Sequence, residues 1–84
     1  MPCICEFDGI RIYMYDNEHQ PPHFHVFARG ESAVVDIKEL DVSAGRLPRA
    51  DRRKVVEWAN RRKEELKRNW ERIERKETLE RIEP

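Results

Sequence analysis

Three histidines lie within seven residues, and they are the side chains of this sequence best suited to chemistry. His19 precedes a Pro-Pro pair, and His23 and His25 follow it in the string EHQPPHFHV. If residues 23–28 form a strand, alternate side chains share a face, which places these last two imidazoles about 7 Å apart at their α-carbons. Imidazole titrates near neutral pH and is also a common metal ligand, so the cluster suits acid–base catalysis or metal binding.

The first interpretation of the cluster is a metal site. In it, His19, His23 and His25 bind one divalent ion such as zinc, and Glu18 is a further candidate ligand. Three protein ligands leave a fourth coordination position open to water. No other cofactor is indicated by the sequence.

Two other interpretations need no metal. In one, His23 and His25 act as acid and base, while Tyr13 and Arg11, which are expected on the same face of the sheet, stabilise a phosphate. That combination is suited to metal-independent cleavage of RNA. In the other, the histidines are structural and hydrogen-bond the Pro-Pro loop.

Short strands are expected to position these residues. Asp8-Gly9 favours a type I′ hairpin turn, because glycine tolerates the positive φ that this turn requires. Residues 40–47 lack apolar alternation, so we expect them to be irregular. The alternating segments predict four strands, over residues 3–7, 10–15, 23–28 and 32–38.

One long amphipathic helix is expected over residues 48–77. Pro48 suits the first turn of a helix, and neither glycine nor proline occurs from residue 49 to residue 76. Its apolar face is predicted to hold Val55, Ala59, Leu66, Trp70 and Ile73. A straight helix of this length spans about 39 Å, and a six-residue strand spans about 20 Å. We therefore expect either a bend in the helix or contact of its far end with the tail, residues 78–84, or with a partner.

Together these elements predict one α+β domain over residues 1–84. A three- to four-stranded, mostly antiparallel β-meander over residues 1–47 packs against one long C-terminal amphipathic helix. A chain of 10.2 kDa excludes a multi-domain enzyme. No apolar run exceeds four residues, which predicts a cytoplasmic protein without a membrane span. Cys3 and Cys5, expected on one face of a strand, should then be reduced thiols.

The charges are divided unevenly along the chain. The net charge is zero, yet residues 1–48 carry −4 and residues 49–84 carry +4. A basic helix can hold RNA phosphates or an acidic protein, although it can also be merely solvated. The candidate binding residues are Arg49, Arg52, Arg53, Lys54, Arg61, Arg62, Lys63 and Trp70.

Several strings resemble a known family. The opening MPCICEFDGIRIYMY, the segment HQPPHFHV, the run AGRLP and the closing LERIEP are similar to the small bacterial family of domains of unknown function numbered 4160. The resemblance covers nearly the whole chain and includes Arg11, Tyr13 and the three histidines. Genes of that family often lie beside a gene of family 2442, which implies a toxin–antitoxin module.

These observations lead to three functional hypotheses. The first is a component of a toxin–antitoxin-like module that binds or cleaves RNA. The second is a non-enzymatic interaction module whose partner is a small acidic protein, such as the product of the neighbouring gene. The third is a small metal-binding domain. Enzymatic activity and oligomeric state are left open at this point.

Overall fold

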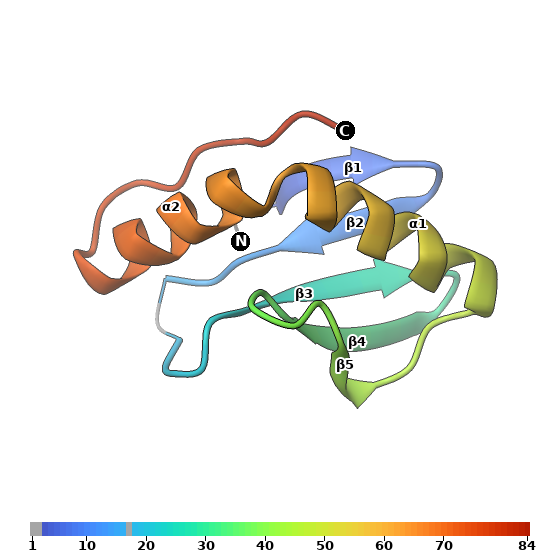
Figure 1. Ribbon diagram of the computed structural model, residues 1–84. Coiled ribbons are helices and arrows are strands. Elements are labelled where there is room, and N and C mark those ends of the chain that lie inside the picture. The colour runs from blue at the N-terminus through green and yellow to red at the C-terminus, as the bar shows by residue number, and fades with distance from the viewer. Residues whose placement is uncertain (1–2, 17) are drawn as a thin grey trace.

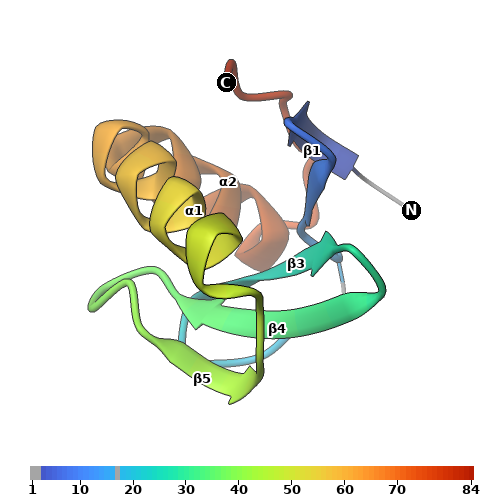
Figure 2. The same ribbon diagram turned by 90° about the vertical axis from the view of Figure 1, so that its right-hand side faces the viewer.

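Five strands in chain order form one antiparallel sheet, and two helices cover one of its faces (Figures 1 and 2). The computed structural model describes residues 3–16 and 18–84. The α+β meander with C-terminal helices is therefore confirmed. The elements are β1 Cys3–Phe7, β2 Ile10–Tyr13, β3 His23–Ala28, β4 Glu31–Asp36, β5 Val42–Gly45, α1 Arg49–Arg61 and α2 Lys63–Glu74.

Two tight turns join the first four strands in pairs. Asp8 and Gly9 have φ of 51° and 76°, as the type I′ turn predicted between β1 and β2 requires. Arg29 and Gly30 have φ of 50° and 78°, so the turn between β3 and β4 has two residues of the same kind. The loop between β2 and β3 is longer and contains a cis peptide bond between Gln20 and Pro21.

The expectation of three to four strands is wrong by one, because β5 lies in the segment expected to be irregular. Val35 pairs with Val42, and Ala33 pairs with Gly45, which has φ of 72°. A Cβ atom at Gly45 would overlap the carbonyl oxygen of Ser32, so this close pairing requires glycine. The strand is short and rich in small residues, which is why it shows no alternation in the sequence.

Two smaller expectations for the first strands are also corrected. The ladder of β2 ends at Tyr13, two residues earlier than expected. The pairing of β1 with β2 is irregular between Cys3 and Cys5, so these residues do not share one face as expected. Cys5 is buried in the core and Cys3 is half-buried, and both are free thiols, as expected.

The prediction of a single long helix over residues 48–77 is wrong, because the helix breaks at Arg62. That residue has φ of −110° and ψ of 19°, and α2 ends at Glu74. The break is the bend expected from the lengths of helix and sheet. It allows Trp58 of α1 and Leu66 of α2 both to reach the core, where each is almost fully buried.

The C-terminal tail covers the outer edge of β1 (Figure 1). Ile82 is buried, and its N–H donates to the carbonyl of Ile4 at 2.8 Å. Two helix side chains hold the tail: the amide of Asn69 bonds the backbone of Glu80, and the indole N–H of Trp58 donates to the carbonyl of Glu83.

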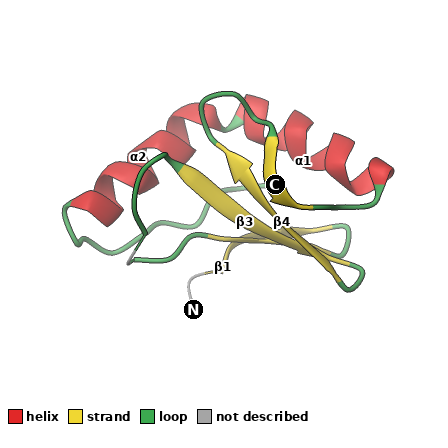
Figure 3. Cartoon of the chain, turned by 90° about the horizontal axis from the view of Figure 1, so that it is seen from below, coloured by secondary structure: helices red, strands yellow, loops and turns green. Residues whose placement is uncertain are grey.

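The hydrophobic core lies between the sheet and the helices. Its strand residues alternate with outward-facing ones, so the other face of the sheet remains open (Figure 3). No helix in residues 3–16 and 18–84 combines the length and apolar character needed to cross a membrane. The largest fully buried side chains include Trp58, Phe24, Ile4, Ile10, Ile12, Met14, Ile37 and Leu66.

Candidate functional site

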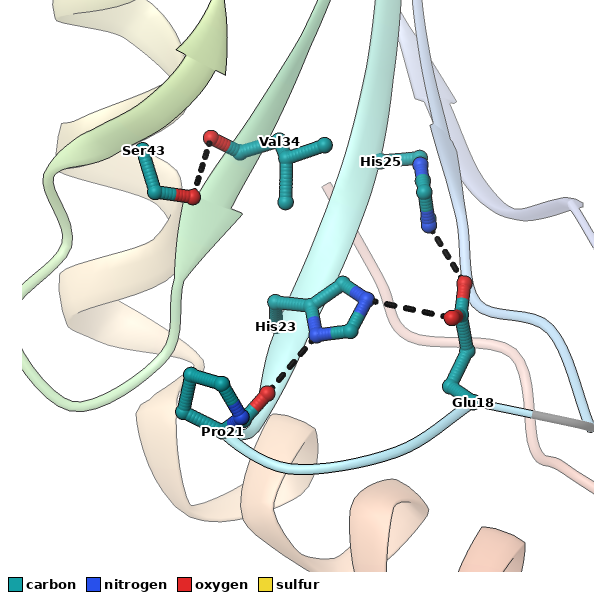
Figure 4. A network of polar contacts seen from close by, with 6 residues as sticks. All are labelled: Glu18, Pro21, His23, His25, Val34 and Ser43. Atoms are coloured by element: carbon teal, nitrogen blue, oxygen red, sulfur yellow. Dashed lines mark hydrogen bonds and ion pairs between the residues drawn. The ribbon is translucent and has the colours of Figure 1, made fainter.

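Two histidines and one glutamate converge where β3 begins, on the open side of the sheet. Phe24 and Val26 of β3 point into the core, so His23 and His25 point the other way. The loop between β2 and β3 brings Glu18 back across them, as Figure 4 shows. The expected pairing of the two imidazoles on one face is therefore confirmed for this part of the chain.

The carboxylate of Glu18 faces both imidazoles at once. Nε2 of His25 lies 2.5 Å from Oε1 of Glu18, and Nε2 of His23 lies 3.3 Å from Oε2 (Figure 4). The three side chains are 13–24% exposed, so the cluster is sheltered but open to solvent on one side.

A backbone contact fixes which nitrogen of His23 faces the cluster. Nδ1 of His23 lies 2.7 Å from the carbonyl oxygen of Pro21. Because a carbonyl oxygen can only accept, Nδ1 carries a proton and donates it. Metal-binding histidines are commonly oriented in this way, with one nitrogen bonded to a carbonyl and the other free for the ion.

The charge of Glu18 is stabilised by its histidine neighbours. Burial alone would raise the pKa of this carboxyl, but the hydrogen bond from His25 and the charge of His23 outweigh burial and lower it. Glu18 therefore stays an anion in the cluster, and an anion between two imidazoles attracts a cation or protons.

Aromatic rings enclose the cluster on two sides. Tyr15 meets His25 edge to face with ring centroids 4.7 Å apart, and Trp70 of α2 lies 5.2 Å from His23. Burial raises the pKa of the Tyr15 phenol, and the neighbouring Tyr13 and Glu18 raise it further, so this phenol stays protonated at neutral pH.

Glu18, His23 and His25 form a set with metal-ligand chemistry. One ligand atom from each residue can be chosen so that all three lie within 4.8 Å of one another. His19 is exposed and is not part of this set. Of the three predicted histidine ligands, the structure therefore brings together His23 and His25. The third member of the set is Glu18, which the sequence offered as a further candidate ligand.

The other residues predicted for acid–base chemistry lie along the same face. Tyr13 is the cross-strand partner of His25, as expected for neighbours on one face. Arg11 lies two residues farther along β2, opposite Phe27, and its Nε is 3.7 Å from Oε2 of Glu6. Arg11 is therefore at some distance from the imidazoles, and its nearest charged partner is a carboxylate.

The residues predicted to bind phosphates or a partner are in several environments. Trp70 is only 4% exposed and packs against His23. Arg62 pairs with Glu65, Lys54 pairs with Asp8, and Lys63 donates to the carbonyl of Lys38. Within the described part of the chain, the remaining four form no ion pair and are exposed: Arg49, Arg52, Arg53 and Arg61.

The comparisons with known proteins give one match. The model of the family described as "Domain of unknown function (DUF4160)" matches residues 9–71, which contain the histidine cluster and α1. No curated protein and no solved structure matches the chain.

Proposed function

This chain belongs to the DUF4160 family of domains of unknown function, and from that premise we propose that it binds a divalent transition-metal ion through Glu18, His23 and His25. The observation that carries the proposal is the convergence of two imidazole nitrogens on one carboxylate, with His23 already oriented by the Pro21 carbonyl. Two histidines and a carboxylate are a common ligand set for zinc and related metals.

The cluster needs positive charge at its centre. A neutral His23 that donates from Nδ1 presents a lone pair on Nε2 toward a carboxylate oxygen 3.3 Å away, and two electron-rich atoms repel each other. Either protons or a metal ion relieve this repulsion. A metal ion would do so without protonating the imidazoles.

Such a centre would hold a reactive water. Three protein ligands leave at least one position for solvent, and the partial exposure of all three residues gives solvent access. A bound zinc ion lowers the pKa of its water to about 7, which makes a hydroxide available for hydrolysis.

Thermal unfolding with and without metal tests the proposal. At a hundredfold excess of free ion over Kd, Zn²⁺ or Ni²⁺ should stabilise the fold by about 2.7 kcal/mol. For a domain of this size that is a rise in Tm of roughly 10–20 °C. Mg²⁺, which prefers oxygen ligands, should have little effect.

Three variants control this experiment. Glu18→Gln and His25→Ala should abolish the metal-dependent rise in Tm, because each removes one ligand. His19→Ala removes an exposed histidine of the same loop that lies outside the ligand set, so it should keep the full rise. A rise that is absent for every transition metal, or that survives in His25→Ala, would show that the cluster is not a metal site.

A second candidate function, binding of a polyanion such as RNA, is supported by the arginines of α1. Arg49, Arg52 and Arg53 lie in its first two turns, are exposed and form no ion pair with any described residue. Arginines concentrated on one surface attract phosphates and give affinity that falls steeply with salt.

Charge reversal tests this second function. Arg52→Glu/Arg53→Glu should abolish binding of RNA at low salt. Arg68→Glu/Arg75→Glu makes the same change in net charge on exposed residues of α2 and of the turn directly after it, and it should leave binding intact. Equal binding by both charge variants would show that the α1 surface is not where RNA binds.

A separate test addresses the toxin–antitoxin role. In a bacterial host, that role would appear as growth arrest when the wild type is induced, and His23→Ala/His25→Ala should not cause the arrest.

A further inference from the structure

A row of aromatic rings runs across the open face of the sheet and ends at the histidine cluster. Phe27 meets Tyr13 edge to face at 5.3 Å, Tyr13 stacks on Tyr15 at 6.1 Å, and Tyr15 meets His25 at 4.7 Å. At 43%, Phe27 is the most exposed large apolar side chain among the described residues. The row thus presents ring edges and faces beside the site proposed above, and Phe27 is its most exposed ring.

The far end of this row opens into a basic hollow. It has a volume of about 370 Å³ and lies between the two tight turns, and its lining includes Arg11, Arg29, Phe27 and Glu31. The carboxylate of Glu31 is paired with Arg46 at 3.6 Å. The ion pair of Arg11 with Glu6 is exposed at both ends, with side chains that are 60% and 57% exposed, so it contributes little and the guanidinium can exchange the carboxylate for a phosphate. Arg29 pairs with the buried carboxylate of Asp51 and donates to the carbonyl of Asp8, but its side chain is 52% exposed and can offer its remaining N–H groups to a phosphate.

The start of α1 lies at this same end of the molecule. Lys54 pairs with Asp8 of the first turn at 3.4 Å, and Asp51 pairs with Arg29 of the second turn at 3.5 Å. Figures 1 and 3 show both turns beside the first turns of α1. Lys54 therefore adds positive charge beside the hollow, and Arg49, Arg52 and Arg53 lie at the same end of the molecule.

We propose that this face binds single-stranded nucleic acid, with bases stacked on Phe27 and the tyrosines and with phosphates at Arg11, Arg29 and the start of α1. The inference rests on the second proposed function, the binding of a polyanion, and assigns the class of ligand. Alternating planar bases and phosphates match a row of rings that leads to arginines, as in other sheets that bind single strands. An acidic protein would match the arginines but not the rings.

The span of the surface suits a short segment of the strand. His25 and Arg29 are four residues apart along β3 and its turn, which corresponds to about 13 Å. Sheets that bind single-stranded RNA stack two or three bases over a comparable surface. A strand held there would extend from the basic hollow toward the histidine cluster.

Fluorescence anisotropy with a labelled 12-nucleotide single-stranded RNA tests the inference. The buffer contains EDTA, so that the result does not depend on the metal centre. Phe27→Leu keeps an apolar side chain of similar size and removes the ring, and it should weaken binding about fivefold or more, since one stacked base contributes at least that much. His19→Ala, which removes an exposed ring outside the row and outside the ligand set, should bind as tightly as the wild type.

The competing explanations give different results in the same assay. Single-stranded DNA of the same sequence should also bind, whereas a duplex should bind more weakly, because its bases are not free to stack. If Phe27→Leu binds normally while Arg52→Glu/Arg53→Glu does not, the polyanion function stands and the stacking surface is disproved. Binding of a polyglutamate peptide as tight as that of RNA would identify an acidic protein as the ligand and overturn the inference. If the wild type binds none of these ligands at low salt, both the polyanion function and the binding of single strands to this face are disproved.

Discussion

Cys3 and Cys5 are two residues apart, yet their thiols lie in different environments. The irregularity in β1 turns Cys5 into the core, where it is 0% exposed, and leaves Cys3 half-buried. Burial raises the pKa of the Cys5 thiol, although the nearby Arg81 lowers it in part. Since the thiolate is the nucleophile, Cys5 is protected from alkylation in two ways: the reagent cannot reach the buried thiol, and the thiol does not ionise readily.

Alkylation of the folded protein should therefore modify Cys3 alone. With iodoacetamide at pH 8, mass spectrometry should show one modified thiol, and the second should react only after denaturation. Cys3→Ser should then give a folded protein with no reactive thiol. Equal rates for both cysteines would show that the core is open at β1.

At the same scale, the sequence indicated part of the candidate site. The i, i+2 spacing of His23 and His25 predicts two imidazoles on one strand face, and the structure has them there. It could not choose between Glu18 and His19 as their neighbour, because a side chain in an irregular loop points where the backbone directs it. The bond from His23 to the Pro21 carbonyl likewise depends on a loop conformation that the sequence does not reveal.

Among the secondary-structure elements, β5 depends on one glycine. Gly45 has φ of 72° and lies against the Ser32 carbonyl, whereas Gly30 has φ of 78° with open space around its α-carbon. Gly30→Ala introduces strain alone, which costs about 1–2 kcal/mol for a left-handed residue. Gly45→Ala adds an overlap with backbone atoms that cannot move without breaking the ladder.

We therefore expect Gly45→Ala to lower the free energy of unfolding clearly more than Gly30→Ala does. Urea unfolding of both variants measures the difference. Amide exchange at the residues of β4 that pair with β5 should also accelerate in Gly45→Ala alone. Equal losses of stability would mean that the pairing of β5 with β4 contributes little.

Two of the strands have the bounds that the sequence predicts. The strands over residues 3–7 and 23–28 agree with β1 and β3, because each has apolar residues on the core side. The break of the helix at Arg62 has no local signal, since neither glycine nor proline occurs there. It arises from packing, because only a bent helix brings both Trp58 and Leu66 onto a sheet shorter than the helix.

For the whole molecule, the tail closes the fold by joining the first strand to the helices. Ile82 inserts its side chain beneath β1 and bonds the backbone of Ile4, while Asn69 and Trp58 bond the backbone of Glu80 and Glu83. The first and last segments of the chain are thereby connected. The edge of β1, which would otherwise offer unpaired backbone groups, is covered.

Ile82→Ala should consequently destabilise the whole domain. The side chain is 4% exposed, and truncating a buried isoleucine to alanine costs about 2–5 kcal/mol. A domain of this length has a total stability of roughly 4–12 kcal/mol, so this loss is a large part of it. Glu83→Ala is the matched control, because its exposed side chain is removed while the carbonyl that accepts from Trp58 remains. Thermal unfolding should show a much lower Tm for the first variant and a nearly unchanged Tm for the second. A small effect of Ile82→Ala would mean that the sheet and helices are stable without the tail, and limited proteolysis would then remove the tail and leave residues 3–76 folded.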